Sequence, residues 1–412
     1  MRTAVGMFYR HTLIKNMHLI PSGGPALLVP NHPSSLMDAA LLGIFLKRPV
    51  HFFARGDIFV HPFVNRILNA LHMHPVHHHE AGRHTLGAND QSINIAISLL
   101  QKGEMVLFFP EGTSHIEYHL WTFKKGAFRI ALQTLERNPA IKLPVVPIGF
   151  NYSHPTKLFS TVWIQAGPPI FANDYLSEYL NQPASATRAL TARSFQAVKE
   201  LLLETGKHDA PILFGALEVW RNSYATAEMS PGARMDAEMN IAKSLPLWQG
   251  EITPLLHQYH QELQSRQVED QVVAAADYPK LNKTPLVMGF PAALIGWILN
   301  ALPLLAARWI ADKKVKRIDF YSWILVAGSA LLYLAWFILL ASASFLLLPT
   351  WKAVALIFIT ISTGQYCWNY FGFYRQWKEQ QEAKKMPAAT LKSLQALRHS
   401  ILKIISSHSP AH

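Results

Sequence analysis

The chain has 412 residues, of which half are hydrophobic and only 16% are charged, so it is more apolar than a typical soluble protein. The formal net charge of +12 favours an anionic partner, either nucleic acid or lipid headgroups. The single cysteine, Cys367, excludes an intramolecular disulfide, and the first residues, MRTAVGMFYRHTLIK, lack the long apolar core of a signal peptide.

Residues 1–170 alternate short apolar runs with helical patterns, which predicts an α/β domain. Strands are expected at 26–29, 50–54, 104–109, 143–150 and 161–167. A helix is expected in NDQSINIAISLLQKG, residues 89–103, with Asp90 as its N-cap and Gly103 as its stop. Near-continuous apolar strands with helices between them imply a sheet covered by helices on both faces.

The rest of the chain changes in character. Residues 171–283 are polar and helix-like, and three stretches without any charge follow, at 284–307, 320–351 and 353–374. Each of the three is long enough to span a membrane. The basic clusters flank these apolar stretches and are not interleaved with stacking aromatics, so we expect membrane lipids and no nucleic acid as partners.

The basic residues also predict a topology. If all three stretches crossed from a cytoplasmic catalytic domain, the basic loop 312–319 and the tail 379–412 would lie outside, against the positive-inside rule. A bend costs little in 284–307, because Pro291 and Pro303 interrupt it. We therefore expect a catalytic domain at the cytoplasmic face, followed by a membrane region at 284–378 with a re-entrant segment at 284–307 and a transmembrane hairpin at 320–374, and a basic cytoplasmic tail at 379–412.

The stretch NHPSSLMD, residues 31–38, carries chemistry. His32 comes just after a strand and Asp38 lies in the first turn of the next helix, so the two can form a general base and its orienting carboxylate. No G-x-S-x-G motif and no cysteine near a turn supplies a nucleophile, which leaves a substrate hydroxyl for that role. The alternative is that Asn31 and the two serines merely cap a helix.

Two other strand ends carry polar groups. The stretch MVLFFPEGTSH, residues 105–115, ends in Glu111, expected as an exposed carboxylate, and in Gly112, which lets backbone N–H groups point at an anion. Lys124 opens the following helix, and Arg55 ends another strand, where it suits phosphate recognition. Because α/β sheets place their sites at the carboxyl ends of strands, these side chains are expected in one site.

Together, NHPSSLMD, FFARGDIF, FFPEGTSH with FKKG, and VVPIGFNY resemble the four ordered blocks of the PlsC-like glycerophospholipid acyltransferases, over roughly residues 10–170. That family includes glycerol-3-phosphate and 1-acylglycerol-3-phosphate O-acyltransferases. The resemblance implies the glycerolipid acyltransferase fold and acyl transfer from acyl-CoA or acyl carrier protein to a hydroxyl of a phosphate-bearing glycerol acceptor, with no cofactor and no metal. It also implies a general base, its partner and a set of substrate-binding residues: His32, Asp38, and Arg55, Glu111, Gly112, Thr113 and Lys124.

Two features depart from the commonest family pattern. Five residues separate His32 from Asp38, where four are usual, and the extra residue must be absorbed in the turn if the pair is to meet. The longer spacing, and VEDQV near residue 268, resemble the branch that contains fungal dual-specificity glycerol-3-phosphate/dihydroxyacetone-phosphate acyltransferases. His78 stands near a place where the family often has arginine.

Two alternatives remain open. The run HMHPVHHH, residues 72–79, has enough histidines for zinc, but it lacks an H-E-x-x-H motif or a cysteine pair, so a partly exposed strand and loop is expected. A membrane-anchored lipid-binding or scaffold protein with a degenerate acyltransferase fold is the rival to an enzyme. The completeness of the four blocks, Glu111 included, favours the enzyme.

Overall fold

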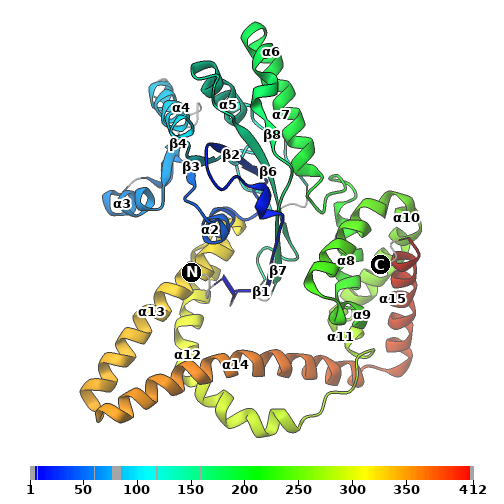
Figure 1. Cartoon of the computed structure of the whole chain (residues 1–412). Helices are drawn as coiled ribbons and strands as arrows, with labels where there is room; N and C mark the ends of the chain where they lie inside the picture. Colours follow the sequence, from blue (N-terminus) through cyan, green and yellow to red (C-terminus); the bar gives the residue numbers. More distant parts are fainter. Residues whose placement is uncertain are drawn as a thin grey trace. The chain divides into compact units, whose positions relative to one another are not determined.

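The computed structural model describes residues 5–6, 8–59, 61–76, 85–116, 119–157 and 160–408. The chain forms two compact units (Figure 1). The first comprises Met1–Glu204 with Arg317–Trp323, and the second comprises Thr205–Lys316 with Ile324–His412.

Within the described residues, the first unit contains an eight-stranded mixed sheet. Its order is β1-β7-β6-β2-β5-β3-β4, and β8 also pairs with β6. The strands β2 to β6 are parallel to one another, whereas β7 runs antiparallel to β6 and parallel to β1. The strands are β1 Tyr9–Lys15, β2 Ala26–Pro30, β3 His51–Arg55, β4 Met73–Val76, β5 Met105–Leu107, β6 Pro144–Tyr152, β7 Ser160–Ala166 and β8 Ile170–Phe171.

The five strands expected from apolar runs are confirmed as β2, β3, β5, β6 and β7. β4 was expected only as a partly exposed strand in the histidine run, and β1 and β8 were not expected. Both β1 and β4 lie at the ends of the strand order, as edge strands. Edge strands carry polar residues and proline more readily than central ones, and the sequences YRHTLIK and MHPV therefore lack the apolar signature.

Helices cover both faces of this sheet, as predicted. Leu27 and Val29 pack in a core with residues of α4, α5 and α7, which lie together along one side of the sheet in Figure 1. Because side chains alternate along a strand, Ala26 and Leu28 point to the opposite face, and both are fully buried there too. The helices of this unit are α2 Leu36–Phe45, α3 Pro62–Ala70, α4 Thr85–Gln101, α5 Gly126–Arg137, α6 Leu176–Asn181 and α7 Pro183–Lys199.

Two local expectations had different outcomes. Helix α4 begins at Thr85, so the prediction that Asp90 caps it is wrong: the helical turn continues upstream of the apolar periodicity. The predicted stop is confirmed, because Gly103 has a φ of +83° and its N–H bonds the carbonyl oxygen of Leu100. The sheet unit runs to Glu204, and buried faces of α6 and α7 pack with the core of the sheet.

The second unit is helical. Its helices are α8 Ala210–Arg221, α9 Tyr224–Glu228, α10 Pro231–Ser265, α11 Asp270–Ala275, α12 Thr284–Lys314, most of α13 Tyr321–Leu347, α14 Thr350–Lys385 and α15 Ala388–His408. Among the described residues, two helical stretches are long and apolar enough to cross a membrane, Thr284–Lys314 and Ile318–Leu347. Helix α14, which holds the third charge-free stretch, is not one of these two; Gln365 and Asn369 lie near its middle.

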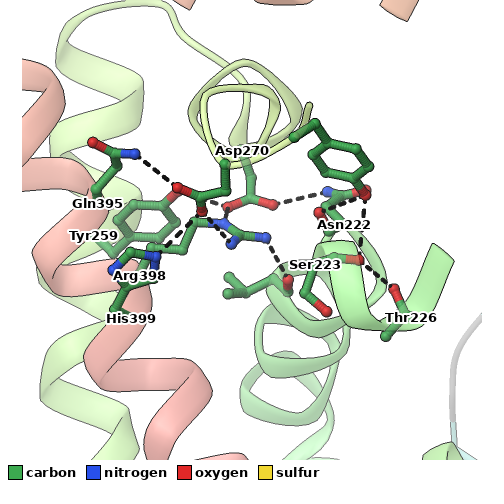
Figure 2. Close-up of polar contacts among 11 residues, drawn as sticks. Asn222, Ser223, Thr226, Tyr259, Asp270, Gln395, Arg398 and His399 are labelled. Atoms are coloured by element: carbon green, nitrogen blue, oxygen red, sulfur yellow. Dashed lines mark hydrogen bonds and ion pairs between the residues drawn. The ribbon is translucent and has the colours of Figure 1, made fainter. Parts of the chain in front are cut away.

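A buried polar network joins four helices of the second unit (Figure 2). Asp270, from the VEDQV motif, accepts hydrogen bonds from Asn222 at 2.8 Å and Tyr259 at 2.6 Å. Arg398 of α15 is 1% exposed and donates to Asp270 at 3.1 Å and to the carbonyl oxygen of Val219 at 2.9 Å. The carboxylate of Asp270 therefore links α15 to α8, α10 and α11. Because it is buried, its charge is stable there only while these partners are present.

Candidate active site

The strand ends that carry the predicted polar residues lie side by side. β2, β5 and β3 are neighbours in the sheet and run parallel, so their carboxyl ends meet at one edge. A cavity of about 880 Å³ lies within the first unit. Five of the seven predicted site residues line it: His32, Arg55, Gly112, Thr113 and Lys124.

The His–Asp pair is formed. His32 Nδ1 lies 2.9 Å from Asp38 Oδ2, and Asp38 is fully buried. The same carboxylate oxygen accepts the Ser34 backbone N–H at 2.8 Å, and Oδ1 accepts the Tyr152 hydroxyl at 2.5 Å. Burial and the adjacent Asp38 raise the pKa of Tyr152 well above its usual value, so this hydroxyl stays protonated and donates. Two donors, the Ser34 N–H and the Tyr152 hydroxyl, thus hold the buried carboxylate against the imidazole.

The turn accommodates the extra residue by an unusual backbone conformation. Ser35 has φ 48° and ψ −130°, a region that residues other than glycine seldom adopt. The Asn31 side chain does not cap α2. Its amide donates to the carbonyl oxygen of Phe150 at 3.0 Å and its oxygen accepts the Phe150 N–H at 2.7 Å, which fastens the start of the turn to β6.

Glu111 is not an exposed carboxylate, so that expectation is wrong: only 6% of the residue is exposed. Its two oxygens accept the backbone N–H groups of His32 at 2.6 Å and Trp121 at 3.2 Å. Burial raises its pKa to about 7, against the opposing effect of these two hydrogen bonds. Glu111 does not line the large cavity; it joins the loop after β5 to the turn that carries His32.

The backbone conformation at position 112 requires glycine. Its φ is +78°, and a Cβ at this position would lie 2.6 Å from the amine nitrogen of Lys124. The backbone N–H of Lys124 bonds the carbonyl oxygen of Pro110 at 2.7 Å, and α5 begins two residues later, as predicted. The lysine amine is therefore held over the glycine turn at the wall of the cavity.

Sequence reasoning missed several contributors to the site. The ring of Phe109 stacks on His32 with centroids 3.6 Å apart, and Arg317 lines the cavity from a distant part of the chain. Tyr152 could have been found, because it lies in the VVPIGFNY block, whereas Arg317 lies in no quoted motif.

The histidine run gives a strand, as expected, over Met73–Val76, and His77–His79 lie outside the described residues. His74 contacts His51, with 3.0 Å between their ring nitrogens. Burial and neighbouring histidines lower the pKa of both, which favours neutral rings. Over the part of the chain that the structure describes, no group of three or more His, Cys, Asp or Glu is arranged to hold a metal.

A histidine fixed by a buried aspartate at a sheet edge, beside a cationic cavity, is an arrangement suited to activating a hydroxyl next to a phosphate. Residues 11–151 match the family model described as Acyltransferase, and this part of the chain is an acyltransferase-family domain.

The relatives are more specific. The chain is 32% identical over 127 residues, 31% of its length and 34% of the relative's, to the chloroplastic 1-acyl-sn-glycerol-3-phosphate acyltransferase LPAT1 of Arabidopsis thaliana. It is 34% identical over 95 residues, 23% of its length and 11% of the relative's, to glycerol-3-phosphate O-acyltransferase 1 of Saccharomyces cerevisiae. It therefore spans about a third or less of these curated relatives.

Among solved structures, the crystal structure of the 1-acyl-sn-glycerophosphate acyltransferase PlsC from Thermotoga maritima matches 48% of this chain and 76% of that one. The sequence identity is 21% and the TM-score is 0.33.

Proposed function

We propose that the chain is a membrane-bound O-acyltransferase that moves a fatty acyl group from acyl-CoA or acyl carrier protein to a hydroxyl of glycerol-3-phosphate or 1-acylglycerol-3-phosphate in phospholipid biosynthesis. One observation carries the proposal: His32, held through Nδ1 by the buried Asp38, lines a cavity that cationic side chains also line. The names of the relatives support the choice of acceptor class.

The mechanism follows from the contact of His32 Nδ1 with Asp38, which leaves Nε2 to act on the substrate. With Nδ1 held by Asp38, Nε2 of His32 accepts the proton of the acceptor hydroxyl as its oxygen attacks the thioester carbonyl. Asp38 stabilises the imidazolium that forms. Collapse of the tetrahedral intermediate forms the ester and releases the thiolate, which takes the proton back from Nε2. The protein contributes no covalent nucleophile to this sequence.

The cavity lining suits both parts of the reaction. Apolar side chains line much of it, as a fatty acyl chain requires, and they include Leu36, Ile58, Ile93, Phe108 and Ile130. Positive side chains line it too: Arg55, Lys124, Lys125, Arg129 and Arg317. Among its described lining residues there is no Asp or Glu, so the formal charge that lines the cavity is positive and attracts a phosphate.

We further propose the cytoplasmic placement and the re-entrant segment 284–307. After the helices α8 to α11 of the second unit comes α12, a continuous helix that contains Pro291 and Pro303. The chain leaves α12 and reaches Arg317–Trp323, which belongs to the sheet unit. The C-terminal end of α12 thus leads into the catalytic unit, which supports a cytoplasmic position for this end of the helix. The basic residues just after 312 agree with the positive-inside rule in this arrangement.

The test uses purified membranes, labelled acyl-CoA and each acceptor in turn. Loss of a general base typically costs about 10²–10⁴ in rate, so His32→Ala should nearly abolish transfer. His18→Ala, which changes an exposed histidine of the same unit, is the matched control. Wild-type turnover in His32→Ala would contradict the mechanism, and absence of transfer in the wild type with every acceptor would favour the rival lipid-binding or scaffold protein.

Phosphate binding is tested separately. Arg55→Ala and Lys124→Ala should raise KM for the phosphate-bearing acceptor more than KM for the acyl donor, because both residues line the cavity. Lys102→Ala, an exposed lysine outside the cavity lining, should change neither. Equal effects on both substrates would contradict the assignment of these residues to the acceptor.

A further inference from the structure

The short segment Arg317–Trp323, which follows α12 and includes the start of α13, is part of the sheet unit. Two hydrogen bonds anchor it there. Ser114, in the loop after β5, donates its hydroxyl to Asp319, and Ser322 donates to the carbonyl oxygen of Pro155. Asp319 and Ser322 are 6% and 1% exposed. A segment that follows a long apolar helix is therefore fastened beside the FPEGTS motif.

This anchoring presents one guanidinium to the cavity. Arg317 donates from Nε to Asp319 Oδ1 at 3.1 Å and from Nη2 to Oδ2 at 2.7 Å, a two-point contact that fixes the plane of the group. Nη2 also lies 3.5 Å from the Ser114 hydroxyl, and the guanidinium carbon lies 5.1 Å from the centre of the Phe320 ring. Among the residues that the structure describes, Nη1 makes no hydrogen bond or ion pair.

Arg317 shares the cavity with the residues expected to bind phosphate. Gly112, Thr113 and Lys124 line it together with Arg317 and Phe320. Asp319 holds two of the guanidinium nitrogens but is not itself among the lining residues. The arginine thus lines the cavity while Asp319 orients its guanidinium, and Nη1 is left to donate to a ligand.

We propose that Arg317 is a phosphate-binding residue of this site, positioned by Asp319 and Ser114, so that the segment Arg317–Trp323 completes the acyltransferase site. The proposal rests on the proposed function. The chemistry it recognises is a phosphate ester, carried by the glycerol acceptor and also by acyl-CoA. The contact with Ser114, two residues after Gly112, favours the acceptor.

A purely structural role predicts something different. If Arg317 only anchored the segment, its loss would lower the stability of the protein and reduce kcat, with no selective effect on one substrate. The hydroxyls of Ser114 and Ser322 already anchor the segment without it. A selective change in one Michaelis constant therefore separates phosphate binding from anchoring.

The experiment uses the full chain in membranes, as Arg317→Ala, Arg317→Lys and the control Lys316→Ala, which removes an exposed neighbouring charge outside the cavity lining. Arg317→Ala should raise KM for the acceptor about 10- to 100-fold, the scale of a lost charge-assisted hydrogen bond. Arg317→Lys should be intermediate, because it keeps the charge and loses the fork, and Lys316→Ala should match the wild type. A rise in KM for acyl-CoA alone would assign Arg317 to the donor's phosphates and still support phosphate binding.

A binding measurement keeps the test independent of turnover. Labelled glycerol-3-phosphate is titrated into detergent-purified His32→Ala with and without Arg317→Ala, with inorganic phosphate as competitor and melting temperature recorded. Loss of binding at unchanged melting temperature supports the proposal even if the wild type transfers no acyl group. Unchanged binding together with unchanged KM values for both substrates, or a fall in melting temperature and kcat without a change in KM, would overturn it.

Discussion

Asp38→Asn is the sharpest test of how the site works. Asp38 is fully buried, with three donors on its two oxygens. In the asparagine variant, the amide oxygen is expected to take the Oδ2 position, because the Ser34 backbone N–H there can only donate. The new NH₂ group then takes the Oδ1 position, where the Tyr152 hydroxyl can rotate and accept from it. The geometry then survives, and what is lost is the negative charge beside His32.

The size of the effect follows from that charge. With about 4 Å between the charge centres and an effective dielectric constant of about 20, the carboxylate stabilises the imidazolium by about 4 kcal/mol. At about 1.4 kcal/mol per tenfold change in rate, kcat should fall about 10³-fold. Because Asp38 touches neither substrate in the proposed mechanism, both KM values should change little.

The assay is the initial rate of transfer from labelled acyl-CoA in membranes with equal amounts of each variant. Asp174→Asn, an exposed carboxylate of the same unit, controls for the loss of one negative charge and should have wild-type activity. If Asp38→Asn retains kcat within about threefold of the wild type, the charge on Asp38 is not needed and the general-base role of His32 fails with it.

Three further predictions concern stability and topology. Because the pKa of Glu111 is raised from 4.5 to about 7, its contribution to stability is full below pH 4.5 and is lost as pH rises through 7. The melting temperature of the wild type should therefore fall relative to that of Glu111→Gln over this interval, by the equivalent of about 3 kcal/mol. Parallel profiles of melting temperature against pH would contradict this. Asp270→Asn should destabilise the second unit by about 3 kcal/mol, because Arg398 loses a buried carboxylate partner. Limited proteolysis should then release α15 faster than in the wild type, and an unchanged rate of release would refute the role of the network. Val315→Cys and Thr350→Cys should differ in labelling by an impermeant thiol reagent in intact cells, with only the second reacting from outside; labelling at 315 would favour three full crossings.

Local sequence patterns determined much of this protein. Apolar runs bounded by turn residues predicted the central strands, because a strand buried on both faces must be apolar at nearly every position. The motif residues were predicted as neighbours since each follows a strand, and β2, β3 and β5 are parallel. The edge strands β1 and β4 escaped the same reasoning, because one side of an edge strand is free of sheet partners and tolerates polar residues.

Only the tertiary structure decided where individual side chains point. Glu111 was expected in solvent at a strand end, yet its carboxylate turns inward to two backbone N–H groups, a choice that depends on two loops folding over it. Whether Asp38 faces His32 depended on the backbone of Ser35, which spacing alone does not predict. Arg317 lies more than 200 positions from Ser114 in sequence, and the two meet at the same cavity. Periodicity and capping are local, so the sequence shows them directly, whereas a contact over such a separation exists only once packing has brought the segments together.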